Sequence, residues 1–258
     1  MHFIFDIDGT ICFDGRSVSP AIQDALSGLE RRGHRIGFAS ARPYRDILPL
    51  LEERFHDGLF VGANGAMTWH RRQLTDLTPL DEDTLAQLFA LAERHAASCL
   101  VDLEWHYHYS GDPAHPFMKM VDPGRLARQV ARAEVSRATK LLFTECEDAE
   151  NLKQALEQRG DIRIHHHSDQ QIMDITAGGV DKASALARHG IAADQMVCFG
   201  NDSNDLSMFA VARHAVLIGD HPQLLPHARE RIIRDQHVER ELIAAIQRLG
   251  ERYAGMPH

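Results

Sequence analysis

The first ten residues constrain the fold of this chain most. The apolar run from His2 to Phe5 has too little polar alternation for a half-exposed strand, so it predicts a strand buried on both faces. The run stops at two carboxylates, Asp6 and Asp8, and the Gly-Thr pair that follows indicates that the chain leaves the strand. We therefore expect both acids at the carboxyl end of a strand, where open α/β sheets bind ligands.

Composition excludes several classes of partner. The length of 258 residues fits one large or two modest domains, and a hydrophobic content of 44% is enough to bury a core. The net charge of −9 argues against a nucleic-acid-binding surface, which needs a basic stripe to neutralise phosphates. No run approaches the ~18 apolar residues of a membrane span, and the amino terminus lacks the layout of a secretion signal. We expect no nucleic-acid partner, no membrane association and a cytoplasmic location.

Short buried strands alternate with helices over residues 1–80. Ser19 and Pro20 predict a helix start. His34 to Ala39 is predicted as a second strand, which ends at Ser40, and Leu59 to Ala63 as a third. This alternation predicts an α/β fold with a doubly wound parallel sheet.

The pattern of predicted elements changes over residues 81–177. An amphipathic helix is predicted over residues 84–97. From Val101 to Tyr109 apolar residues stand at odd positions and polar residues at even ones, which predicts a half-buried antiparallel strand. Lys140 to Cys146, Ile162 to His167 and Gln171 to Ile175 are predicted as further strands. Residues 81–177 are therefore expected to form an α+β unit inserted between two parts of the parallel-sheet domain, residues 1–80 and 178–258.

After residue 178 the first pattern returns. Asp181 can cap a helix that carries Lys182 in its first turn, and lysine is scarce in this chain. Gln195 to Phe199 is predicted as a buried strand that leads into a polar loop with Asp202 and Asp205. These two acids and the first acidic pair come from strand ends that would be neighbours in the sheet.

Such a cluster of acids requires a cation. Like charges ~4 Å apart cost about 4 kcal/mol per pair at an effective dielectric constant near 20. Hard oxygen ligands select Mg²⁺ over zinc or copper. The sequence therefore predicts a magnesium site.

These segments resemble the motifs of the haloacid dehalogenase superfamily, whose members are mostly Mg²⁺-dependent phosphatases that work through an aspartyl-phosphate. The matching segments are Asp6-Ile7-Asp8-Gly9-Thr10, Ser40-Ala41-Arg42-Pro43, Lys182 at its helix start, and the loop 200–205. Asn64-Gly65-Ala66 is similar to an element of the Cof-type branch. The resemblance implies a Rossmann-like core with the inserted unit as a large cap that closes over the site.

The resemblance also implies roles for the matched residues. Asp6 would be the nucleophile and Asp8 the proton donor to the leaving alcohol, and Ser40 and Lys182 would complete the catalytic set. The substrate-binding residues would be Thr10, Ala41, Arg42, Asn64, Gly65 and Asn204. The Mg²⁺ ligands would be Asp6, Asp8, Asn201 and Asp205. Since the family usually has aspartate where Asn201 stands, Asp202 is a possible substitute ligand.

The function implied by the resemblance is hydrolysis of small phosphorylated metabolites, with sugar phosphates as the expected class and a monomer or weak homodimer as the expected state. Two alternatives stay open. One is a sugar phosphomutase on a similar core and cap, and the other is a metabolite-binding regulator that kept the fold. The intact catalytic set argues against the regulator.

Substrate specificity is expected to depend on residues 81–177. Candidates for contacts to sugar hydroxyls or to a second charge are Asp102, Glu104, His106, His108, His165 and His167. The alternative is a solvated sheet face, because polar alternation alone predicts one.

Overall fold

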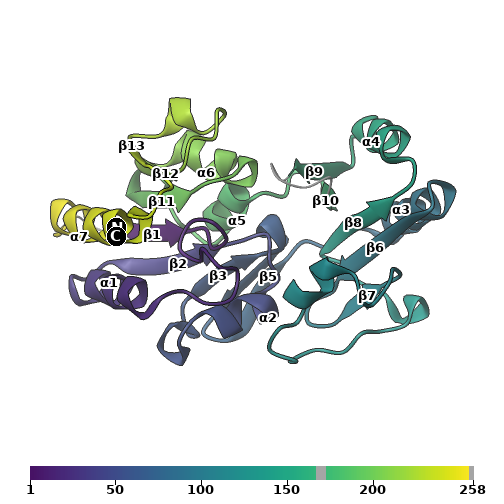
Figure 1. The fold of residues 1–258 in the computed structure, drawn as a ribbon, viewed down its shortest axis with the longest axis horizontal. Coiled ribbons are helices and arrows are strands. Elements are labelled where there is room, and N and C mark those ends of the chain that lie inside the picture. Colours follow the sequence, from purple (N-terminus) through teal and green to yellow (C-terminus); the bar gives the residue numbers. More distant parts are fainter. Residues whose placement is uncertain (167–172, 256–258) are drawn as a thin grey trace.

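Two β-sheets organise the chain (Figure 1). The structure, a computed structural model, describes residues 1–166 and 173–255. The first sheet has eight strands and is built from both ends of the sequence, whereas the second has five strands from the middle of the chain. None of the helices in the described part of the chain is long and apolar enough to cross a membrane.

The first sheet has the strand order β13-β12-β11-β1-β2-β3-β4-β5. Its strands are β1 (His2–Phe5), β2 (Arg35–Ala39), β3 (Leu59–Gly62), β4 (Met67–His70), β5 (Gln73–Leu77), β11 (Met196–Gly200), β12 (His214–Ile218) and β13 (Glu230–Ile232). Neighbouring strands from β13 to β3 are parallel, with β1 between β11 and β2. The carboxyl ends of these strands therefore meet at one edge.

Helices cover both faces of this sheet. Successive side chains of a strand point to opposite faces, and so Phe3 and Phe5 pack with α1 (Pro20–Arg31) and α7 (Val238–Arg252) while Ile4 packs with α5 (Lys182–Arg188) and α6 (Leu206–Val211). The short helix α2 (Tyr44–Ile47) follows β2. The expected α/β class with a parallel core sheet is confirmed.

The second sheet is antiparallel, with the order β7-β6-β8-β10-β9. Its strands are β6 (Ala97–Asp102), β7 (Tyr107–Tyr109), β8 (Lys140–Cys146), β9 (Ile162–His166) and β10 (Met173–Ala177). Helices α3 (Glu82–Arg94) and α4 (Ala149–Glu157) share a buried core with it. This arrangement is α+β, and the exact boundaries of the inserted unit stay predictions.

The predicted single strand from Val101 to Tyr109 is wrong. The strand β6 ends at Asp102 and β7 begins at Tyr107, and the two pair as a hairpin. The amide of Leu103 donates to the carbonyl of His106 and closes the turn. Period-2 alternation continues through this turn without glycine or proline, so no local pattern marks the turn.

The hairpin of β4 and β5 was also not predicted. These strands make the far end of the first sheet antiparallel. Arg71 and Arg72 at the turn have φ values of 52° and 60°. Two-residue turns with positive φ usually contain asparagine or glycine, and two arginines do not signal one.

Candidate active site

The first acidic residue lies at the centre of the sheet edge. β1 ends at Phe5, and the amide of Asp6 continues the strand pairing by donating to the carbonyl of Phe199 in β11. Its side chain is 5% exposed, and Thr10 Oγ1 donates to its Oδ2 at 2.9 Å. The predicted strand end therefore presents a nearly buried carboxylate.

Lys182 lies between Asp6 and a second buried carboxylate, Asp205. Its Nζ is 2.8 Å from Asp6 Oδ1 and 2.6 Å from Asp205 Oδ1. The pKa of Asp6 is raised to about 7, because burial and the charge of Asp205 raise it more than Lys182 lowers it. Burial alone would lower the pKa of Lys182, but the two carboxylates more than offset this and raise it. The lysine stays charged as a result.

The predicted helix start places this lysine. Asp181 is the N-cap of α5, and its side chain accepts from the amide of Ser184. Gly65 allows the loop after β3 to approach this cap, because a Cβ on it would lie 2.3 Å from the carbonyl oxygen of Asp181. Lys182, the first residue of α5, is thereby directed into the sheet edge.

The loop after β11 is folded around Asp205. Its Oδ2 accepts from the amides of Asn201 and Asp202 at 2.8 and 3.2 Å. A Cβ at Gly200 would lie 2.5 Å from this oxygen, so only glycine fits there. Both oxygens of Asp205 are engaged by protein donors, and its part as a metal ligand stays a prediction.

Asn201 points its side-chain amide at the oxygens expected to bind metal. The amide terminus lies 2.9 Å from the carbonyl oxygen of Asp8 and 3.0 Å from Asp6 Oδ2. Neighbouring ligands of an octahedral Mg²⁺, each 2.0–2.1 Å from the ion, are about 3 Å apart. With its oxygen turned inward Asn201 completes such a ligand set, and these residues therefore fit a magnesium ion.

With its nitrogen turned inward, Asn201 instead satisfies the same atoms without a cation. The amide then donates to Thr10 Oγ1 at 2.9 Å and to the Asp8 and Asp6 oxygens. The described residues contain no group of three or more His, Cys, Asp or Glu side chains arranged for a metal. The groups that converge here are the carboxylate of Asp6, the backbone carbonyl of Asp8 and the side-chain amide of Asn201. Asp202 lies next to them, with Oδ1 accepting from the amide of Ser203, and its role as a substitute ligand stays a prediction.

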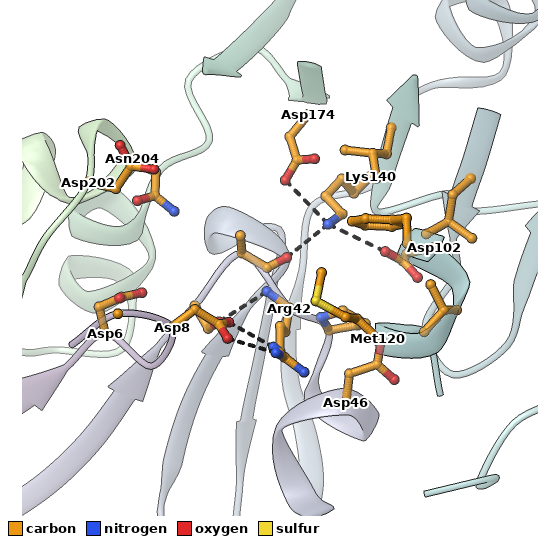
Figure 2. A pocket seen from close by; sticks show the side chains of 18 of the residues that line it. Asp6, Asp8, Arg42, Asp46, Asp102, Met120, Lys140, Asp174, Asp202 and Asn204 are labelled. Atoms are coloured by element: carbon orange, nitrogen blue, oxygen red, sulfur yellow. Dashed lines mark hydrogen bonds and ion pairs between the residues drawn. The ribbon is translucent and has the colours of Figure 1, made fainter. Parts of the chain in front are cut away.

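The second acid, Asp8, pairs with an arginine. Arg42 Nε and Nη2 lie 2.7 Å from the two carboxylate oxygens of Asp8 (Figure 2). Arg42 Nη1 is buried without a hydrogen-bond partner among the described residues. Because a buried unpaired donor is costly, this nitrogen is available to an oxygen of a ligand.

A cavity of about 320 Å³ opens above these groups. Of the predicted site residues, those in its lining are Asp6, Asp8, Ser40, Ala41, Arg42, Asn201, Asp202 and Asn204. Lys182 and Asp205 lie behind Asp6, and Thr10, Asn64 and Gly65 support the loops around it. The structure thus brings the predicted residues together. Some of them line the cavity, and the others contact the residues that line it.

A chain of polar contacts connects the two sheets. Asn204 Nδ2 donates to Asn64 Oδ1 at 3.0 Å, and Asn64 Nδ2 donates to Asp174 Oδ2 at 2.9 Å. Lys140 Nζ lies 3.3 Å from the same oxygen and donates to the carbonyl of Ala41 at 2.9 Å. The loops after β2, β3 and β11 therefore all reach the second sheet through hydrogen bonds.

Sequence reasoning missed the charged residues Asp46, Lys140, Asp174 and Arg234 of the cavity wall, because no motif marks them. Asp102 was a candidate, and it lines the cavity as a buried acid rather than as part of a solvated sheet face. A usable signal existed for Asp174, a charge inside the apolar run Ile172 to Ile175, since buried charges are almost always paired. The scarcity of lysine was a weaker signal for Lys140.

The other candidates on the second sheet have different surroundings. Glu104 is exposed, and neither it nor His106 is in the cavity lining. The Nδ1 of His108 contacts the carbonyl of Val130 at 3.0 Å, and the Nε2 of His165 contacts Thr176 Oγ1 at 2.9 Å. His167 and Gln171 lie outside the described residues.

Comparison with known proteins gives one consistent family. A family model described as haloacid dehalogenase-like hydrolase matches residues 3–239. The 5-amino-6-(5-phospho-D-ribitylamino)uracil phosphatase YitU of Bacillus subtilis is 24% identical over 232 residues, which cover 83% of this chain and 85% of that protein. The HMP-PP phosphatase of Serratia proteamaculans is 26% identical over 252 residues, which cover 85% and 84%.

Solved structures show the same fold. A haloacid dehalogenase-like hydrolase from Bacteroides thetaiotaomicron matches with a TM-score of 0.80 and 20% identity over 96% of this chain and 98% of that one. A structure described as the HAD subclass IIB sugar phosphatase BT4131 matches with a TM-score of 0.78 at the same identity and coverage. At this identity the likeness concerns the fold alone.

Proposed function

Because the chain belongs to the haloacid dehalogenase-like hydrolases, as its motifs predicted, we propose that it is a Mg²⁺-dependent phosphatase of small phosphorylated metabolites. The single observation that carries this proposal is the geometry at the end of β1. There Asp6 pairs with buried Lys182, faces the cavity, and lies beside an Asp8 that Arg42 orients. This is the arrangement that phosphoryl transfer to a carboxylate needs.

Asp6 is the proposed nucleophile. One of its oxygens attacks phosphorus as the bond to the leaving oxygen breaks, and an aspartyl-phosphate forms. Burial and Asp205 raise the pKa of Asp6 toward neutrality, which disfavours the ionised form that attacks. The ammonium of Lys182, 2.8 Å away, counteracts this effect and supplies fixed positive charge.

Asp8 is the proposed acid and base. It gives a proton to the leaving oxygen, then takes one from the water that attacks phosphorus and releases inorganic phosphate from Asp6. Arg42 binds both carboxylate oxygens of Asp8, which fixes the direction of the side chain, and one of these two hydrogen bonds must open for Asp8 to carry the proton that it donates. The partnerless Nη1 of the same arginine can donate to a phosphoryl oxygen, and Ser40 in the cavity wall is a second donor.

The metal-binding oxygens in this proposal are those of Asp6, the Asp8 carbonyl and Asn201. A bound Mg²⁺ supplies charge neutralisation for the phosphoryl oxygens and for the attacking carboxylate. Asp205 holds the loop that carries Asn201, through the amides of Asn201 and Asp202.

The substrate is proposed to be a small phosphorylated metabolite, with sugar phosphates as the first class to test. A cavity of about 320 Å³ is at the small end of ligand sites. The names of the relatives point to small molecules too: a phosphoribitylamino-uracil, HMP-PP and a sugar phosphate.

Phosphate release tests the proposal. The purified chain is incubated with a panel of phosphorylated sugars, nucleotides and cofactors, and with p-nitrophenyl phosphate, each with Mg²⁺ and with a chelator. We expect inorganic phosphate from at least one compound, and only with the metal. Transfer of the phosphoryl group to another hydroxyl of a sugar, without phosphate release, would identify a mutase instead.

A further inference from the structure

The cavity has a second polar region, on the side away from Asp6 and Asp8. Three carboxylates and one ammonium group face it there: Asp46 from α2, Asp102 from β6, Asp174 from β10 and Lys140 from β8 (Figure 2). We call these four residues the distal cluster. The other cations of the lining, Arg42 and Arg234, lie by Asp8 and by Gly9 respectively.

The ammonium group of the distal cluster is engaged mainly by the protein. Lys140 Nζ donates to the carbonyl of Ala41 at 2.9 Å and to Asp174 Oδ2 at 3.3 Å, and it forms an ion pair with Asp102 at 3.6 Å, which is beyond hydrogen-bond distance. An ammonium group has three N–H donors, and the protein accepts two of them. The charge of Lys140 is shared between two carboxylates.

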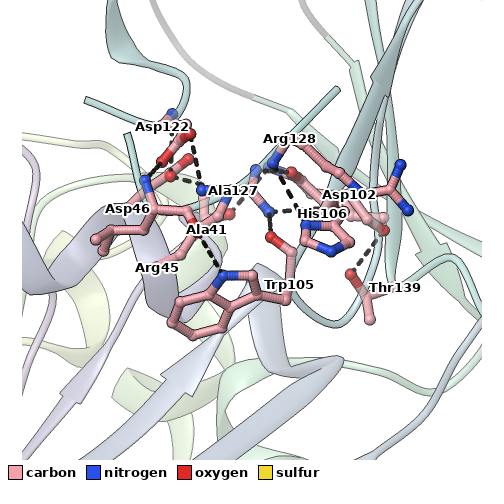
Figure 3. A network of polar contacts seen from close by, with 12 residues as sticks. Ala41, Arg45, Asp46, Asp102, Trp105, His106, Asp122, Ala127, Arg128 and Thr139 are labelled. Carbon is pink, nitrogen blue, oxygen red and sulfur yellow. Dashed lines mark hydrogen bonds and ion pairs between the residues drawn. The ribbon is translucent and has the colours of Figure 1, made fainter. Parts of the chain in front are cut away.

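The nearby guanidinium also pairs with carboxylates of the protein. Arg45 is 1% exposed and does not line the cavity. Its Nη2 pairs with Asp102 at 2.5 Å and its Nη1 donates to the carbonyls of Trp105 and His106 (Figure 3). Its Nε lies 3.2 Å from Asp46 in an ion pair but makes no hydrogen bond among the described residues. An anionic ligand here would meet three carboxylates, and the charges of Lys140 and Arg45 are already paired with them.

Asp46 keeps one oxygen for a ligand. Its Oδ1 accepts from the amide of Asp122 at 3.1 Å and pairs with Arg45. Its Oδ2 has no hydrogen-bond partner among the described residues, although the residue is only 4% exposed and lines the cavity. A nearly buried acceptor with an unused oxygen favours a ligand that brings a donor.

We propose that Asp46 determines specificity by accepting a hydrogen bond from an amino or hydroxyl group of the leaving group, and that the distal cluster rejects a leaving group with a second anion. This inference rests on the proposed phosphatase function and adds the chemical class of the leaving group. The remaining wall is apolar, formed by Leu100, Phe117, Met120, Val121 and Leu142. A compact leaving group that carries a hydrogen-bond donor and has one less polar side fits this cavity best.

The test uses three hexose phosphates that share one ring. Glucosamine 6-phosphate carries an amine, glucose 6-phosphate a hydroxyl, and glucose 1,6-bisphosphate a second anion. Their kcat/KM values are measured by phosphate release with Mg²⁺ at pH 8, where Asp46 is ionised because its pKa is about 7. Each compound is also measured as a competitor of p-nitrophenyl phosphate hydrolysis, so that all three are ranked even if one is not turned over. We expect the amine to be preferred over the bisphosphate by at least tenfold.

The variant Asp46→Asn should reduce this amine-to-bisphosphate ratio by tenfold or more, because the carboxylate is replaced by an amide of the same shape. Asp83→Asn, an exposed carboxylate of α3, makes the same change of charge away from the cavity and should leave the ratio within twofold. A wild-type chain that accepts the bisphosphate as well as the amine overturns the inference, whether or not the variant folds. So does an unchanged ratio in Asp46→Asn.

The two proposals fail in different ways. If no compound, including p-nitrophenyl phosphate, releases phosphate, the phosphatase function itself is wrong. If phosphate is released without discrimination among the three sugars, the phosphatase function is retained and only the role of Asp46 is wrong.

Discussion

Lys182 Nζ lies 2.8 Å from Asp6 Oδ1 and 2.6 Å from Asp205 Oδ1, and neither Lys182 nor Asp205 has measurable exposure. One buried ammonium thus compensates two buried carboxylates that come from strands at opposite ends of the sequence. Removal of this charge leaves both acids uncompensated, which costs far more than loss of an exposed pair.

Lys182→Met should therefore lower the free energy of unfolding by about 3–5 kcal/mol. Urea unfolding at pH 8 measures this change. The matched control is Lys153→Met on α4, whose ammonium is half-exposed and 3.9 Å from Glu157, and it should cost less than ~1 kcal/mol. Equal stability of the two variants would show that Lys182 does not hold the site together.

Asp6→Asn should abolish turnover and leave the fold intact. The amide keeps the shape, and its one oxygen can still accept from Lys182, but it lacks a nucleophilic carboxylate. We expect phosphate release to fall at least ~10³-fold, with a thermal unfolding transition as cooperative as that of the wild type. A variant that retains turnover would remove Asp6 as the nucleophile.

Asn201→Asp should strengthen Mg²⁺ binding. The side chain ends 2.9–3.0 Å from the Asp8 carbonyl and from Asp6 Oδ2, and aspartate places a second negative charge there. Calorimetric titration should give at least tenfold tighter binding, and chelator should lower the melting temperature of the variant more than that of the wild type. Asp202→Asn is the companion variant, because a loss of Mg²⁺ affinity there would mean that Asp202 replaces Asn201 as the ligand.

The parts of the site that the sequence predicted come from local patterns joined by one topological rule. The apolar run before Asp6, the end of β2 at Ser40 and the cap at Asp181 are all visible within a few residues, and a parallel sheet then gathers the strand ends at one edge. No side-chain pairing across the two sheets was needed for this expectation.

The distal cluster could not be predicted in the same way. Its contacts join residues far apart in sequence, such as Arg45 of α2 with Asp102 of β6 and Asn64 of the loop after β3 with Asp174 of β10. Period-2 alternation placed Asp102 on a polar face. The contacts with residues of the first sheet's helices and loops bury it instead. The same alternation hid the turn between β6 and β7.

The stability of the chain should depend on pH through Asp46. Its pKa is raised from the ordinary 3.8 to about 7, because burial and Asp102 raise it more than Arg45, the amide of Asp122 and Arg42 lower it. Lys140 on β8 is a further cation near this carboxylate. The unfolded chain thus releases this proton near pH 4, whereas the folded chain holds it up to about pH 7.

Between these two values the folded state binds more protons, so the contribution of Asp46 to stability is complete below pH 4 and is lost as the pH rises through 7. An asparagine side chain at this position does not titrate. Relative to the wild type, Asp46→Asn should gain stability as the pH rises, by up to about 1.4 kcal/mol per pH unit inside this window. Urea unfolding at pH 5, 6, 7 and 8 measures the difference, with Asp83→Asn as the control whose difference stays constant. A difference for Asp46→Asn that is equally constant would mean that Asp46 is already ionised at pH 5 in the folded chain.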